Sequence, residues 1–194
     1  MKVLLNVALI LVSTTFLTEG IRRNLALESV VLRTEKCVCD INPRYGNSTC
    51  STKVKSRNVT NVNASFTLIR KVEDLTYNAK TFYQFSNNEY RPMLIDVTMN
   101  FCANEKGIPS SPLHAVMRAI INDYTNFYDS CPFLPGKLYY VKDWNFVASD
   151  LPSVVPAGRY MLNFTFFCDR GQYCGNFGVY FRVDNHGILE LNVG

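Results

Sequence analysis

The stretch YMLNFTFFC at positions 160–168 decides the fold class of this 194-residue chain. Its large apolar side chains recur at every second position: Tyr160, Leu162, Phe164 and Phe166. A period of two is typical of a β-strand with one buried face, because successive side chains point to opposite sides of the sheet. The intervening polar residues, including Asn163, are therefore predicted to face water.

The same alternation continues toward the carboxyl terminus. One face of a second predicted strand carries Phe177, Val179, Phe181 and Val183. Residues 184–187, DNHG, then supply turn chemistry, and the alternation resumes over residues 189–193. The chain is therefore predicted to end in a β-hairpin.

Residues 53–70 also alternate, and they are predicted to form a single half-buried strand. The apolar face of this strand holds Val54, Val62, Ala64, Phe66 and Leu68. The polar face begins with a basic row, Lys53, Lys55 and Arg57. A solvated strand face is favoured for this row over contact with anionic lipid headgroups at the mouth of a lipid site. Further strands are predicted at residues 80–85, 93–102 and 137–147.

One segment, residues 112–128, has helical rather than β periodicity. Pro112 suits the first helical position, and the apolar residues that follow have helical spacing: Leu113, Val116, Met117, Ile120, Tyr124 and Phe127. This predicts one amphipathic helix between Cys102 and Cys131, and a disulfide closing that loop would contribute roughly 3–4 kcal/mol. Several short strands with one helix predict a mainly β, two-sheet sandwich with the helix on an edge or across an open end.

The first 20 residues have the pattern of a secretory signal peptide. A positive start is followed by an apolar run and then by small residues, with cleavage expected close to Gly20. A membrane anchor is the less favoured interpretation. A helix needs about 20 apolar residues to span a bilayer, and this apolar run is shorter. Residues 21–194 are therefore predicted to form one secreted, extracellular domain without stable membrane insertion. The net charge of +4 is too small and too dispersed for a typical nucleic-acid binder.

The seven cysteines indicate disulfides rather than a metal site, because neither paired CxxC units nor histidine partners accompany them. The predicted pairs are Cys102–Cys131, Cys168–Cys174, and Cys50 with either Cys37 or Cys39. The alternative joins an amino-terminal cysteine to Cys168 or Cys174. Because seven is odd, one thiol remains free or pairs between molecules. Four N-x-S/T sequons predict glycosylation at Asn47, Asn58, Asn63 and Asn163.

The sequence shows no catalytic set and no cofactor motif. His114 and His186 have no partner visible in the sequence, and the carboxylates are scattered singly. We therefore expect a protein that is not an enzyme and that holds no cofactor or metal. The high aromatic content permits another role, since a sandwich whose sheets splay apart encloses an apolar cavity. The candidate lining residues are Phe66, Leu68, Met117, Ile120, Phe164, Phe166 and Phe181.

Four landmarks carry a resemblance to a known family. They are Cys50 leading into the basic strand, Tyr90-Arg-Pro92 leading into an apolar strand that ends at Cys102, Asn126 followed by Cys131-Pro132-Phe133, and Leu151-Pro152 followed by Pro156-Ala-Gly158. In their order and spacing the chain resembles an insect family of secreted proteins of unknown function, related to the ML lipid-recognition superfamily and to insect chemosensory proteins. It departs from that family at Asn100, where an Asp is usual, and in the additional pair Cys168 and Cys174.

The resemblance implies an immunoglobulin-like, ML-type sandwich that holds a lipid or other small hydrophobic ligand between its sheets. It also implies extracellular work, in chemosensation or pheromone transport. The alternative is a secreted module without a cavity, which binds a receptor or another secreted protein.

Overall fold

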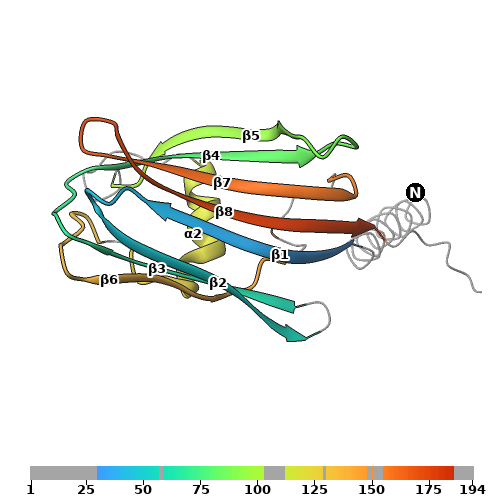
Figure 1. Cartoon of the computed structure of the whole chain (residues 1–194), viewed down its shortest axis with the longest axis horizontal. Helices are drawn as coiled ribbons and strands as arrows, with labels where there is room; N and C mark the ends of the chain where they lie inside the picture. The colour runs from blue at the N-terminus through green and yellow to red at the C-terminus, as the bar shows by residue number, and fades with distance from the viewer. Residues whose placement is uncertain are drawn as a thin grey trace, which may run out of the picture.

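In the computed structural model, which describes residues 30–56, 59–102, 112–128, 130–147, 150 and 155–185, the stretch at 160–168 lies in β7 (Gly158–Cys168). This strand occupies the middle of a five-stranded antiparallel sheet. Tyr160, Leu162 and Phe164 are buried on its inner face, as the alternation predicts. The predicted mainly β, two-sheet sandwich is confirmed (Figure 1).

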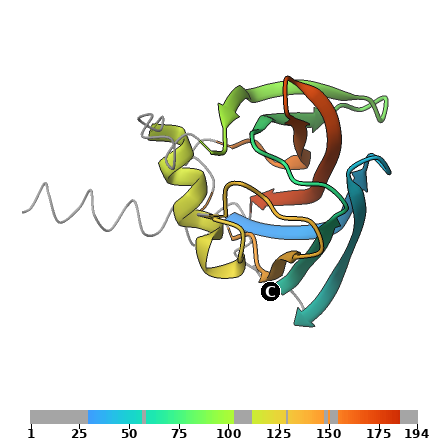
Figure 2. The same cartoon turned by 90° about the vertical axis from the view of Figure 1, so that its left-hand side faces the viewer.

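Two antiparallel sheets face each other. The first has the order β1-β8-β7-β4-β5 and the second has the order β2-β3-β6. The remaining strands are β1 (Val30–Ile41), β2 (Gly46–Ser56), β3 (Val59–Leu68), β4 (Leu75–Gln84), β5 (Tyr90–Asn100), β6 (Leu138–Trp144) and β8 (Gln172–Asn185). A single short helix, α2 (Pro112–Ile121), lies along one side of the sandwich (Figure 2). No helix in the described part of the chain is long and apolar enough to span a membrane.

The predicted strand at 53–70 is wrong in its extent, because two antiparallel strands, β2 and β3, occupy this region. Residues 57 and 58, which include Arg57 and the sequon residue Asn58, lie outside the described residues. The alternation of polar and apolar residues continues through both strands, and no glycine or proline lies between them. The sequence pattern therefore gives no sign that the chain reverses direction. Val54, predicted to be buried, is 73% exposed near the end of β2. Lys53 and Lys55 are exposed, as the favoured solvated face requires.

The predicted helix is too long at its carboxyl end. Helix α2 ends at Ile121, and a 3-10 turn, η1 (Asn122–Tyr124), follows. Thr125 then forms an isolated β-bridge with Val141 of β6. The side chain of Asn126 donates to the carbonyl of Leu138 at 2.9 Å and accepts from the amide of Tyr140 at 2.8 Å. These bonds fix the segment against β6, and they explain why the helical spacing does not continue as a helix.

Two other regions differ from the sequence predictions. Strand β1 has no counterpart among them, although it forms one edge of the larger sheet. Strand β8 continues through Asn185, so the turn predicted at 184–187 does not begin at Asp184. The second half of the predicted hairpin and the signal peptide at 1–20 lie outside the described residues.

Three disulfides join the elements. Cys39–Cys50 links β1 to β2, Cys102–Cys131 ties the end of β5 to the segment before β6, and Cys168–Cys174 closes the turn between β7 and β8. The first two predicted pairs are present, and the open choice for Cys50 is settled in favour of Cys39. The alternative pairing of an amino-terminal cysteine with Cys168 or Cys174 is wrong. Cys37 is free and half-buried, and burial raises the pKa of its thiol.

Candidate ligand cavity

A cavity of about 160 Å³ lies between the two sheets. It occupies the part of the sandwich that contains Cys39, Cys168 and Cys174, and Met117 and Ile121 reach it from α2. Aromatic side chains dominate its wall: Phe66, Tyr77, Phe101, Phe127, Tyr128, Phe133, Trp144, Phe164, Phe166 and Phe177. A site of this composition favours an apolar guest, because burying polar groups without hydrogen-bond partners is costly.

Aromatic contacts hold one wall together. Phe66 of β3 stacks on Tyr139 of β6, with ring centroids 5.1 Å apart, and it lies 6.0 Å from Phe127. Phe101, just after β5, lies 5.7 Å from Phe127 and stacks on Tyr128 at 5.0 Å. The segment after η1 therefore bridges β3 of the smaller sheet to the end of β5 in the larger one. Such pairs contribute about 0.5–1.5 kcal/mol each beyond their buried area.

The opposite wall comes from β4 and β7. Tyr77 of β4 lies 6.2 Å from Phe164 and 6.4 Å from Phe166. Its hydroxyl donates to the sulfur of Met99 at 3.7 Å. Desolvation raises the pKa of Tyr77 to about 12, so this group stays neutral at physiological pH. Burial also raises the pKa of Tyr128.

The polar lining residues gather on one side of the cavity. They are Asp40 of β1, Ser48 of β2, Ser65 of β3 and Asn176 of β8. Asp40 and Asn176 are direct register partners, and Asp40 is exposed. The carboxylate of Asp40 points to the outer face of the larger sheet, where it accepts from the hydroxyl of the exposed Tyr173 at 3.4 Å. Ser48 shares the inner face of its sheet with its register partner Phe66, and the surface of the cavity is almost entirely apolar.

Five of the seven predicted lining residues are brought together at this cavity: Phe66, Leu68, Met117, Phe164 and Phe166. Phe181 lies elsewhere, buried between Tyr160, at 5.4 Å, and Phe146, at 4.9 Å. Ile120 packs against the larger core cluster, while its neighbour Ile121 reaches the cavity. Consecutive residues on a helix point about 100° apart, so an error of one position moves a side chain to another surface.

Sequence reasoning missed several aromatic lining residues, among them Phe101, Phe133 and Trp144. Trp144 is the single tryptophan of the chain. Phe101 directly precedes Cys102, and Phe133 lies two residues after Cys131; both are outside any regular strand or helix. Their position beside the predicted disulfide was the available signal, because the bond brings both flanking segments to one place.

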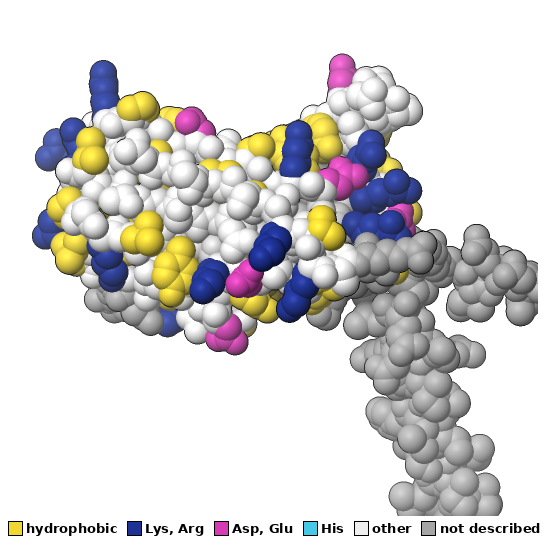
Figure 3. Space-filling view, turned by 60° about the horizontal axis from the view of Figure 1, so that its bottom comes forward, with side chains coloured by type: hydrophobic (Ala, Val, Ile, Leu, Met, Phe, Trp, Pro, Cys, Tyr) yellow, Lys and Arg dark blue, Asp and Glu magenta, His cyan; other side chains and the backbone are white. Residues whose placement is uncertain are grey.

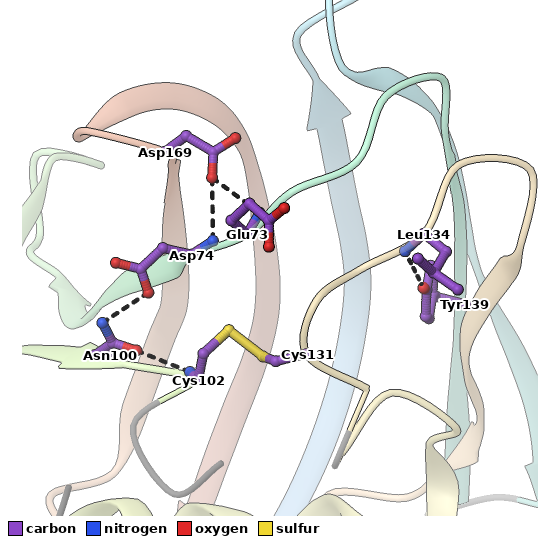
Figure 4. The surroundings of a disulfide bond; sticks show 8 residues. All are labelled: Glu73, Asp74, Asn100, Cys102, Cys131, Leu134, Tyr139 and Asp169. Atoms are coloured by element: carbon purple, nitrogen blue, oxygen red, sulfur yellow. Dashed lines mark hydrogen bonds between the residues drawn. A yellow bond between two sulfur atoms is a disulfide. The ribbon is translucent and has the colours of Figure 1, made fainter. Parts of the chain in front are cut away.

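The disulfide Cys102–Cys131 belongs to a polar clamp at this end of the sandwich (Figure 4). The carboxylate of Asp169 accepts from the amides of Glu73 and Asp74 at 2.9 and 3.0 Å. The side-chain amide of Asn100 donates to Asp74 at 2.9 Å, and its oxygen accepts from the amide of Cys102 at 2.8 Å. The clamp therefore connects the β7–β8 turn, the start of β4 and the end of β5 around the cavity.

Comparison with known proteins gives one match to a family model. Residues 77–162 match the model described as "Protein of unknown function (DUF1091)". The predicted resemblance to a family of unknown function is confirmed. The matched segment includes β4, β5, α2, β6 and the first part of β7, and it contains the pair Cys102–Cys131. No curated protein matches the chain.

The solved structures that match the chain include two at low sequence identity. The crystal structure of chicken MD-1 complexed with lipid IVa is 11% identical, with a TM-score of 0.41, and the match covers 80% of this chain and 98% of that one. A Niemann-Pick type C2 protein from the Japanese carpenter ant is 13% identical, with a TM-score of 0.35, and the match covers 76% and 96%.

The amide of Asn100 makes two hydrogen bonds that a carboxylate could not both make. A carboxylate at this position would still accept from the amide of Cys102, but it would not donate to Asp74. We expect Asn100→Asp to lower the free energy of unfolding by about 1–3 kcal/mol at pH 7, because two carboxylates would then face each other. The loss should shrink near pH 4, where one proton can be shared, and chemical denaturation at both pH values measures it.

Asn78→Asp is the matched control for this prediction. Asn78 also donates to a carboxylate, that of Asp96 at 3.0 Å, but Asp96 is exposed. Water and the ammonium of Lys80, 2.9 Å from Asp96, screen this second pair of carboxylates. Asn78→Asp should therefore cost less than Asn100→Asp, although it also removes the bonds from Asn78 to Val97 and Thr98. Equal losses for the two variants would contradict the role assigned to the clamp.

The raised pKa of Tyr77 predicts alkaline sensitivity. The unfolded chain ionises this tyrosine near pH 10 and the folded chain near pH 12, so the unfolded state loses its proton first. The contribution is constant below pH 10, and stability falls as the pH rises from about 10 to about 12. Tyr77→Phe should make this fall shallower but not abolish it, because burial also raises the pKa values of Tyr128 and Tyr160.

Chemical denaturation between pH 9 and pH 12 measures this dependence. All proteins compared should carry Cys37→Ser, which removes the free thiol and prevents disulfide exchange at alkaline pH. Identical slopes with and without the Tyr77 hydroxyl would show that this group does not control the alkaline limit.

Proposed function

We propose that this protein binds a lipid or another small hydrophobic molecule in the cavity between its sheets. The observation that carries the proposal is the aromatic wall around a volume of about 160 Å³. An apolar cavity of about 150 Å³ stays dry and takes up benzene-sized guests, so a void of this size and lining can hold an apolar group. Burial of such a group contributes roughly 0.8 kcal/mol for each CH₂.

The size of the cavity limits what it encloses. Pockets for drug-sized ligands measure about 300–1,000 Å³, which is larger than this volume. The proposed guest is therefore a small apolar molecule, or the end of one hydrocarbon chain. Metal-assisted chemistry is not part of the proposal, and the described residues contain no cluster of three or more metal-ligating side chains.

We further propose that residues 21–194 act as one secreted, extracellular domain, in chemosensation or pheromone transport. The signal-peptide pattern, the three disulfides and the sequons support secretion. Asn47 is exposed, and Asn63 and Asn163 are half-buried on the strands where the sequence placed them. The alternative, a module for a secreted or receptor partner, predicts a filled core and an exposed apolar patch, with the odd cysteine available to link a partner. The cavity and the half-buried position of Cys37 favour the carrier over this alternative.

Native mass spectrometry of protein purified from the medium of secreting cells tests the proposal. We expect an added mass that disappears on extraction with organic solvent and that reappears when the extracted material is returned. A protein that carries no such mass, and that never binds a fluorescent fatty-acid probe, would overturn the carrier function. Glycopeptide mapping of the same sample tests the glycosylation sites independently.

A further inference from the structure

Two loops lie side by side at the end of the sandwich nearest the cavity. They are residues 69–74, between β3 and β4, and residues 133–137, before β6. Val72 and Phe133 exchange backbone hydrogen bonds at 3.0 and 2.9 Å, and the amide of Gly136 donates to the carbonyl of Leu68 at 2.8 Å. The hydroxyl of the buried Tyr139 accepts from the amide of Leu134 at 2.8 Å. The two loops therefore present one fixed surface.

This surface carries exposed apolar side chains between cations. Ile69 is 62% exposed and Leu134 is 48% exposed. Arg70, Lys71 and Lys137 flank them, and all three are exposed. We call these five residues the basic–apolar end. Figure 3 shows dark-blue and yellow side chains together at the end of the molecule on the left, which is where Figure 1 places these loops.

Two of the cations are available to an anionic partner. The guanidinium of Arg70 lies over the ring of Tyr45 at 5.3 Å, and the ammonium of Lys137 lies over the ring of Tyr139 at 5.1 Å. Lys71 pairs with Glu73 at 2.7 Å. Within the described part of the chain, no carboxylate forms a salt bridge with Arg70 or Lys137. Their charges are therefore not neutralised by any carboxylate that the structure describes.

The same loops form part of the cavity wall. Leu68 and Val72 bracket the exposed residues of the first loop, Phe133 precedes Leu134 in the second, and all three line the cavity. The exposed and buried sides of these loops are thus only a few residues apart along the chain. A partner that contacts the outer side would lie next to the stored ligand.

We propose that the basic–apolar end docks on an anionic phospholipid membrane. Each Lys or Arg near such a surface strengthens binding about fivefold, through attraction to phosphate and carboxylate headgroups. Ile69 and Leu134 project as separate loop-tip side chains that can enter the boundary between headgroups and acyl chains, where apolar groups lower the free energy of binding. The attachment is weak and reversible, as the small number of contacts requires. It does not depend on the cavity being occupied.

Vesicle co-sedimentation tests the proposal with the full secreted chain, its glycans intact. The vesicles are phosphatidylcholine alone, or phosphatidylcholine with about 30% phosphatidylserine, at about 0.05 and 0.15 M salt. We expect binding to the anionic vesicles only, and weaker binding at the higher salt concentration. The double variant Arg70→Glu with Lys137→Glu should bind at least about tenfold more weakly, and Ile69→Ser with Leu134→Ser should also weaken binding.

The far end of β3 offers a matched control. Lys53, Val54 and Lys55 near the β2–β3 connection are also basic and apolar, and β3 separates them from Ile69 by about 30 Å. Lys53→Glu with Val54→Ser and Lys55→Glu should leave vesicle binding close to that of the unaltered protein. Equal losses at both ends, binding that ignores phosphatidylserine, or no binding at all would overturn the proposal. Normal vesicle binding by a protein that never takes up an apolar guest would overturn the carrier function and leave the membrane proposal standing.

Discussion

Replacing both Cys102 and Cys131 with Ser is expected to lower the free energy of unfolding by about 3–4 kcal/mol. The bond closes a loop with a sequence separation of 29, and Cys102 is completely buried. Breaking it increases the conformational entropy of an unfolded loop that includes α2 and η1. It also releases Phe101 from the aromatic wall around the cavity, so ligand affinity should fall together with stability.

The pair Cys168 and Cys174 provides the comparison for this loss. Their sequence separation is 6, and the same entropy relation gives about 2 kcal/mol for their replacement by Ser. Guanidinium denaturation of both double variants, with Cys37→Ser in each, measures the difference. Equal losses of unfolding free energy for the two pairs would mean that Cys102–Cys131 does not stabilise the protein by closing the longer loop around α2.

Phe133→Ala is expected to cost about 3–5 kcal/mol, the usual range for removing a large buried aromatic side chain. Phe133 is buried, lies 5.1 Å from Tyr139 and 5.7 Å from Phe101, and lines the cavity. Its removal enlarges the cavity instead of letting the core collapse, because the disulfide and the bridge to Val72 hold the surrounding backbone. An added apolar guest should then restore part of the lost stability, in proportion to its occupancy.

The adjacent Leu134→Ala is the control, since Leu134 is exposed and its loss should stay within about 0.5 kcal/mol. Thermal denaturation of both variants, with and without benzene, measures the two effects. If benzene stabilises Phe133→Ala no more than the unaltered protein, the removed side chain did not border the cavity.

The sequence predicted which face of a strand a side chain lies on better than it predicted which side chains lie at the cavity. Alternation in 160–168 and 177–183 correctly placed Phe164 and Phe181 on an inner face, but it carries no information about position along the strand. Phe181 pairs with Tyr160 in register, near the start of β7, and therefore lies away from the cavity. The cavity itself depends on how far two sheets separate, which follows from packing between residues distant in the sequence.

The helix and the division of 53–70 into two strands, β2 and β3, show the same limit. The helical spacing of apolar residues continues to Phe127, but the helix ends earlier. The side chain of Asn126 instead forms hydrogen bonds with the backbone of β6. The pairing of Cys102 with Cys131 was predictable, because the two cysteines bracket one helical segment in the sequence. The aromatic residues beside these cysteines line the cavity only because the strands around them bring both segments to the same end of the sandwich.

Quenching of Trp144 by bromobenzene tests the central claim most directly. Trp144 is the single tryptophan and lines the cavity, and bromine quenches tryptophan fluorescence only at close contact. Ala64 lies on the inner face of β3 and lines the cavity, so Ala64→Phe should fill it. Thr67→Phe, on the same strand but away from the cavity, is the control. We predict that quenching saturates with bromobenzene concentration in the unaltered protein and in Thr67→Phe. In Ala64→Phe the quenching should not saturate. The same non-saturating quenching in all three proteins would contradict a ligand-binding cavity.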